Sequence, residues 1–327
     1  MSIHRTSPTV ATLLLVPLAL ACREGGRTTS TEGASSPVVS ASVPESRTDS
    51  GTISTTVNEA TVSYSDAEQA YQRRSYGEAA QLFDSYRRQN ADNAWGHYMY
   101  GLSAWKAGRP GDALTGFDEA LRLDPDHRKS LFNSARVLLE TGQPGQALER
   151  IDRALSLEPL SAEGHRLLGR ARVELGQFDE AIDAYQRAIA IDDRDVWSMN
   201  NLGLLYIQRG QSDEAVLPLA RAVELRGNSP VFQNNLGTAL EQTGHVAEAK
   251  QAYEAAVAAD SGYAKAVSSL ARITPLVQPG DTNTIDLVEA SREFQAEVSR
   301  LQDTTTGPDS VSAQASVEEM PRDSSPQ

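Results

Sequence analysis

Small and apolar residues recur along the chain with a period of 34 residues. When Ala60 is counted as position 1 of the first unit, positions 4, 7, 8 and 11 have the spacing of one helix face. Small side chains recur at positions 8, 20 and 27, and a large apolar side chain recurs at position 24. Glycine recurs at position 15, as Gly108, Gly142, Gly176, Gly210 and Gly244. Each unit is therefore predicted to hold two packed helices, A and B, with a left-handed glycine that ends helix A.

Six consecutive units keep this register. They are residues 60–93, 94–127, 128–161, 162–195, 196–229 and 230–263, followed by a partial unit at 264–274. The period and the recurring small residues resemble the tetratricopeptide repeat, TPR. The resemblance implies an all-α fold, a right-handed TPR superhelix (α-solenoid) of six repeats plus a seventh helix A. An amphipathic segment at 284–302 is predicted to be a C-terminal capping helix over the last open hydrophobic face.

Both ends of the chain are predicted to lie outside this fold. Residues 1–21 have a basic start and an apolar run too short to span a bilayer, which is typical of a secretory signal peptide. Leu18–Cys22 resembles the lipobox of bacterial lipoproteins, which implies lipidation of Cys22 and anchoring to the outer membrane, facing the periplasm. Simple secretion after cleavage in the same segment is the alternative. Residues 22–59, rich in serine and threonine, are predicted to be a disordered tether, and residues 303–327 a disordered acidic tail.

Charge and composition exclude several classes of function. The chain has 30 Lys and Arg against 44 Asp and Glu, a net charge of −14, which argues against nucleic-acid binding. Its single cysteine excludes an intrachain disulfide and a cysteine-rich metal cluster. The sequence contains no phosphate-binding glycine loop, zinc-protease helix or nucleophile elbow. We therefore expect a protein that is not an enzyme and that uses no cofactor and no metal.

Binding residues are expected opposite the packing face of helix A. Positions 2, 6, 9 and 13 point away from that face, and the TPR resemblance implies that they line a concave groove. The aromatic and apolar candidates on this surface and its flank are Trp95, Tyr98, Met99, Trp105 and Trp197. The tryptophans at position 2 either contact a ligand or tuck against the preceding helix B, and the sequence favours neither.

Polar candidates follow further along the same surface. The amides are Asn133, Asn200, Asn201, Asn234 and Asn235, and the cations are Arg136, Arg166 and Arg170. A primary amide both donates and accepts, so a row of them can pair with the backbone of an extended peptide. The row resembles the asparagine ladder of peptide-binding helical solenoids, although asparagine at position 6 is also common background in TPR proteins. The arginines either meet an acidic segment or form an ordinary solvated face.

These features together predict a non-enzymatic scaffold or assembly factor at the bacterial outer membrane. It would bind an extended or acidic protein segment in the concave TPR groove. In architecture it is similar to the pilotins and to TPR lipoproteins that organise envelope complexes. The alternative is a glycan-binding or cell-wall-binding module in which concave tryptophans stack on sugar rings. The sequence does not reveal the partner or the oligomeric state.

Overall fold

The computed structural model describes residues 62–278 and 282–306, and within these ranges it contains fourteen α-helices and no strand. The predicted signal peptide, Cys22, the tether and most of the predicted tail lie outside the described residues. The helices are α1 (Tyr64–Gln72), α2 (Tyr76–Gln89), α3 (Ala94–Lys106), α4 (Pro110–Leu123), α5 (Arg128–Glu140), α6 (Pro144–Leu157), α7 (Ala162–Glu174), α8 (Phe178–Ile191), α9 (Val196–Gln208), α10 (Ser212–Leu225), α11 (Pro230–Gln242), α12 (Val246–Ala259), α13 (Ala264–Ile273) and α14 (Leu287–Thr306).

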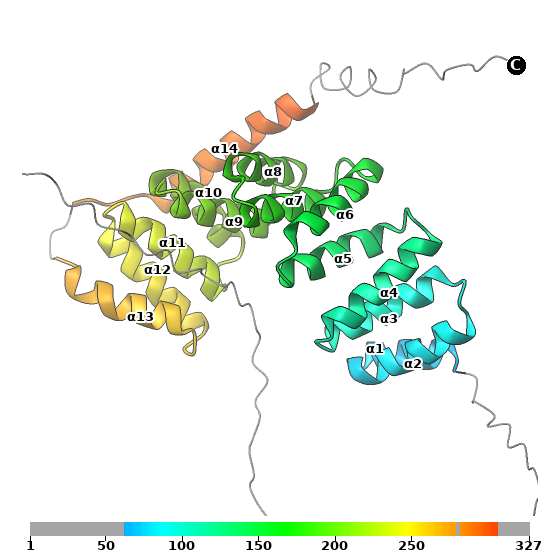
Figure 1. Ribbon diagram of the computed structural model, residues 1–327. Helices are drawn as coiled ribbons and strands as arrows, with labels where there is room; N and C mark the ends of the chain where they lie inside the picture. The colour runs from blue at the N-terminus through cyan, green and yellow to red at the C-terminus, as the bar shows by residue number, and fades with distance from the viewer. Residues whose placement is uncertain (1–61, 279–281, 307–327) are drawn as a thin grey trace, which may run out of the picture. The chain divides into compact units, whose positions relative to one another are not determined.

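Consecutive helices pack side by side in pairs, and each pair packs on the next (Figure 1). The A helices are α1, α3, α5, α7, α9, α11 and α13, and the B helices are α2, α4, α6, α8, α10 and α12. From α3 onward each A helix begins at position 1 of its 34-residue unit. This all-α stack of helix pairs confirms the predicted fold class.

The turn between the two helices of a pair has a left-handed residue, as predicted. The five glycines at position 15 have φ between +72° and +84°. In this region a side chain with a Cβ is disfavoured, whereas glycine is not. In the first unit the equivalent residue is Arg74, with φ of +63°, so this turn keeps its shape despite the missing glycine.

The paired helices approach closely where the small residue at position 8 of helix A meets the large side chain at position 24 of helix B. A Cβ added to Gly203 would lie 2.4 Å from Cγ of Leu219, and one added to Gly169 would lie 2.6 Å from the ring of Tyr185. Both large side chains are buried. The predicted role of the position 8 glycines is therefore confirmed.

The C-terminal helix differs from the predicted one in its bounds and in its location. The sequence predicts it at 284–302, over the last open hydrophobic face of the stack. Instead α14 begins at Leu287, continues to Thr306 and packs on α8 and α10 (Figure 1). Val288, an apolar residue in the first turn of α14, is 56% exposed. The buried residues of α14 are Ala290, Ser291, Phe294 and Val298.

No helix in the described part of the chain is both long and apolar enough to cross a bilayer. Helix α13 packs on α12, and its residue Val267 remains exposed. Asn283, which precedes α14, lies beside the turn before α12, where Nδ1 of His245 is 3.1 Å from the carbonyl oxygen of Asn283. The chain therefore returns along its own helix pairs toward α8.

Candidate functional site

Positions 2 and 6 of the A helices differ in exposure. At position 2, Trp95 is 38% exposed and Trp197 is 48% exposed. At position 6, Met99 and Asn133 are buried, whereas Asn201 is only partly buried. The expectation that Met99 lines an open groove is therefore wrong. Met99 belongs to the apolar core formed by the first helix pairs, because position 6 faces the neighbouring helix in this part of the stack.

The aromatic residues of the first two repeats pack against one another and form a hydrogen bond with one another. The Nε1 of Trp95 donates a 2.7 Å hydrogen bond to Oη of Tyr64. The Trp95 ring lies 5.0 Å from the Tyr98 ring and 5.7 Å from the His127 ring, measured between centroids. Tyr98 is buried, and this burial raises the pKa of its phenol to about 12. Trp95 therefore serves as a packing residue between repeats.

Trp105 and Asn133 also use their polar groups within the fold. The Nε1 of Trp105 donates a 2.7 Å hydrogen bond to Oε2 of Glu140, one repeat further along. The Nδ2 of Asn133 donates to Oη of Tyr98 at 3.2 Å, and its Oδ1 accepts from Nη1 of Arg136 at 2.7 Å. The amide of Asn133 therefore links helices α3 and α5 and has little capacity left for a ligand.

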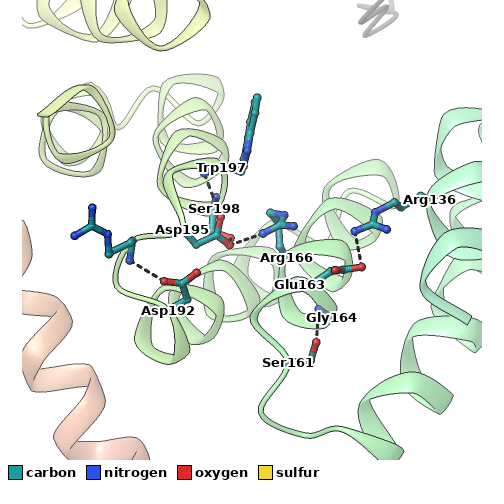
Figure 2. A network of polar contacts seen from close by, with 10 residues as sticks. Arg136, Ser161, Glu163, Gly164, Arg166, Asp192, Asp195, Trp197 and Ser198 are labelled. Atoms are coloured by element: carbon teal, nitrogen blue, oxygen red, sulfur yellow. Dashed lines mark hydrogen bonds and ion pairs between the residues drawn. The ribbon is translucent and has the colours of Figure 1, made fainter. Parts of the chain in front are cut away.

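All three candidate arginines form ion pairs, and Figure 2 shows those of Arg136 and Arg166. Arg136 pairs with Glu163, and Arg166 pairs with Asp195 at 2.6 Å between Nη1 and Oδ2. Arg170 pairs with Glu174 of its own helix at 3.1 Å. These carboxylates compensate the positive charge that would otherwise attract an acidic segment. The geometry favours an internal role for both residues, since Arg136 joins α5 to α7 and Arg166 joins α7 to the N-cap of α9.

The amides further along the stack are connected across the repeats. The Nδ2 of Asn235 donates a 2.9 Å hydrogen bond to Oδ1 of Asn200. Burial raises the pKa of the Tyr185 phenol, and Asn201 opposes this rise only weakly. Asn234 is buried, and its Oδ1 has no hydrogen-bond partner among the described residues. Asn201 and Asn235 are only partly buried, so this part of the predicted row retains accessible amides.

Trp197 differs from the other two tryptophans. Figure 2 shows its ring projecting from the start of α9, away from the Arg166–Asp195 pair. Its ring packs against the Phe232 ring in a T-shaped arrangement, at 5.2 Å between centroids, and the Arg226 guanidinium lies 5.3 Å from the Trp197 ring centre. Among the described residues its indole N–H, unlike those of Trp95 and Trp105, has no hydrogen-bond partner.

Comparison with known families identifies the repeat. Three models described as tetratricopeptide repeat match the chain. The first matches residues 64–128, 98–144 and 132–196, the second 184–216 and the third 232–263, which together cover more than half of the chain. The chain is a tetratricopeptide repeat protein.

Solved structures with the same fold include other tetratricopeptide repeat proteins. One from Parabacteroides merdae matches with a TM-score of 0.53 and 14% identity, over 64% of this chain and 81% of that one. The Cut9–Hcn1 hetero-tetramer of the APC/C matches with a TM-score of 0.56 and 15% identity, over 64% of this chain and 41% of that one. MamA of Desulfovibrio magneticus matches with a TM-score of 0.48 and 24% identity, over 50% of this chain and 92% of that one. A comparison with curated proteins found no match.

Several residues that organise this surface of the TPR stack were not predicted from the sequence. Glu163 of α7 pairs with Arg136 of α5, Asp195 at the start of α9 pairs with Arg166 of α7, and Phe232 packs on the Trp197 ring. The sequence did contain a local signal for the role of Asp195, because an aspartate directly before a helix is a common N-cap. Its carboxylate does accept hydrogen bonds from the N–H groups of Trp197 and Ser198. In the described ranges no three His, Cys, Asp or Glu side chains come together in a way that would hold a metal ion.

Proposed function

We propose that this TPR protein is a non-enzymatic scaffold that binds an extended protein segment on its A helices, at repeats 5 and 6. The observation that carries the proposal is the state of Trp197. It is half exposed, its ring packs against Phe232, and its indole N–H has no partner among the described residues. Exposed aromatic residues with a rigid support are typical anchors of protein interfaces.

The residues around Trp197 suit an extended backbone. Val231, at the same position of the next repeat, is exposed and offers an apolar contact. The Oδ1 of Asn235 remains available, because only the Nδ2 of this amide is used in its bond to Asn200. An amide acceptor and an indole donor can pair with the N–H and C=O groups of a peptide irrespective of its sequence. The proposed site therefore consists of Trp197, Asn201, Val231 and Asn235, which we call the Trp197 site.

The Trp197 site can be tested by photo-crosslinking in cells. A crosslinking amino acid at Val231 should trap a protein partner, and one at the exposed Asp152 of α6 should not. Trp197→Ala should abolish the trapped product and weaken binding of the identified partner about thirtyfold, which corresponds to about 2 kcal/mol. Circular dichroism provides the folding control. Equal trapping from Asp152, or undiminished trapping in Trp197→Ala, would place binding elsewhere.

The glycan alternative loses part of its support in the structure. It required Trp95, Trp105 and Trp197 to offer open rings, but the first two are hydrogen-bonded and packed within the fold. A single open indole beside an amide suits a peptide better than a run of sugar rings. Binding of purified glycan strands at Trp197, with no protein partner present, would favour the alternative.

The location of the scaffold is part of the same proposal. The sequence Leu18–Cys22 supports lipidation of Cys22 and anchoring at the outer membrane, on the periplasmic side. Several acyl chains hold a protein firmly at a bilayer, whereas one chain does so only marginally. Residues 22–59 would then act as the tether between the anchor and the TPR stack. The partner would be another protein of the cell envelope.

The anchor makes a separate prediction. Cys22→Ala should remove the acylation site, so that the protein is either left uncleaved or released from the membrane fraction. Fractionation after a high-salt wash, together with the mass of the mature N-terminus, measures both outcomes. The same chain with Ser30→Ala is the control, because it changes a residue of the tether and leaves the lipobox intact. A Cys22→Ala protein that is fully processed and still membrane-bound would contradict lipid anchoring.

A further inference from the structure

Helix α14 connects parts of the chain that are far apart in sequence. Gln302 donates a 3.1 Å hydrogen bond from Nε2 to the carbonyl oxygen of Ala190, at the end of α8. Ser291 donates to the carboxylate of Glu224 on α10. A TPR repeat ordinarily contacts only its neighbours. Helix α14 adds a second connection between repeats 4 and 5, on the side of the B helices.

The buried face of α14 belongs to the apolar cluster that supports Trp197. Phe294 and Val298 of α14 join a contiguous set of buried side chains that includes Tyr185 of α8 and Met199 of α9. The same cluster contains Phe232 of α11, which is fully buried. The Phe232 and Trp197 rings pack against each other with 5.2 Å between their centroids. One packed cluster therefore extends from α14, on the B-helix side, to the exposed indole on the A-helix side.

We propose that α14 is a positioning element of the Trp197 site and that Phe294 acts as a positioning residue through the cluster containing Phe232. The role of α14 in ligand binding rests on the proposed function. The coupling between Phe294 and Trp197, by contrast, is a property of the protein without any ligand. Protein interiors are close-packed, so removing a large side chain from one end of a cluster shifts its other members. Undocking α14 therefore loosens the support of Trp197 without any change in the residues of the site.

The coupling can be measured on Trp197 itself. Trp95→Phe together with Trp105→Phe leaves Trp197 as the single tryptophan, and its fluorescence reports its surroundings with no partner present. In this background Phe294→Ala should raise the acrylamide quenching constant roughly twofold, because the indole becomes more mobile and more accessible. Backbone amides of α9 and α11 should exchange with solvent about tenfold faster. Phe294→Leu, which keeps most of the apolar volume, should restore both values.

A matched control separates positioning from general destabilisation. Ile151 of α6 is fully buried, but it belongs to a different cluster that contains neither Phe232 nor any α14 residue. Ile151→Ala should lower the melting temperature yet leave Trp197 quenching unchanged. The proposal is overturned if Phe294→Ala releases α14, as seen by exchange of its amides, while quenching stays at the parent value. It is also overturned if Ile151→Ala raises quenching equally.

The outcome is independent of the partner experiment. If Trp197→Ala leaves partner binding unchanged, the proposed function fails, but the quenching data still decide whether α14 positions Trp197. If quenching responds to Phe294→Ala and the partner binds at Trp197, the same variant should weaken binding while Phe294→Leu restores it. Failure of that rescue would refute the role of α14 in binding.

Discussion

Replacing Gly116 by alanine should destabilise the second helix pair by about 3 kcal/mol. A Cβ at Gly116 would lie 2.6 Å from the amide nitrogen and 2.7 Å from Cα of Gly101, and 2.8 Å from the carbonyl oxygen of His97. These are backbone atoms of α3, so a change of rotamer cannot relieve the clash. Helices α3 and α4 must separate, and the apolar contacts on both sides of Gly116 loosen. Thermal and urea denaturation followed by circular dichroism measure the loss.

The same helix provides the control for this prediction. A Cβ at Gly111 of α4 meets no atom within 4 Å, and its backbone does not have positive φ. Because alanine is the better helix former, Gly111→Ala should be neutral or stabilise by up to about 1 kcal/mol. Equal melting temperatures for Gly111→Ala and Gly116→Ala would show that α3 and α4 do not approach as closely as described.

Replacing Arg166 by alanine should cost about 3 kcal/mol, because it leaves the carboxylate of Asp195 without its cation. The Asp195 side chain is 3% exposed and the Arg166 side chain 25% exposed. The remaining donors to Asp195 are the hydroxyl of Ser198, at 2.6 Å, and two backbone N–H groups. These donors satisfy the hydrogen-bonding capacity of the Asp195 carboxylate but do not neutralise its charge. The loss in the free energy of unfolding therefore falls at the lower end of the range for breaking a buried ion pair.

Arg170 on the same helix is the matched control. Its partner Glu174 lies four residues further along α7, and both side chains are about one-third exposed. Exposed pairs of this spacing contribute about 0.3 to 0.5 kcal/mol, so Arg170→Ala should have a small effect. In Arg166→Ala/Asp195→Asn the buried charge is absent, and much of the stability should return. Urea denaturation of the four proteins tests this order, and an equal loss for both arginine variants contradicts it.

The Trp197 site shows how far local sequence reasoning reaches. Position in the repeat groups Trp95 with Trp197, and both are partly exposed in the structure. It could not distinguish them, because their difference depends on residues one repeat away. Tyr64 accepts the indole N–H of Trp95, whereas no described residue accepts that of Trp197. The arginines present the same difficulty, since Glu163 and Asp195 decide whether they attract a ligand or hold successive A helices together.

The features of this fold that depend on short-range spacing can be predicted from the sequence. The 34-residue period, the glycines at position 15 and the small residues at position 8 predict the helix pairs, their turns and their close packing, because these features involve neighbouring turns of chain. Tertiary structure alone decided where α14 packs and which polar groups remain open. The sequence of an amphipathic helix shows that it has an apolar face, but not which surface of the fold that face will cover. Several apolar faces of the stack are alternatives. The match between Phe294 and the α8–α10 face therefore arises only in the assembled stack.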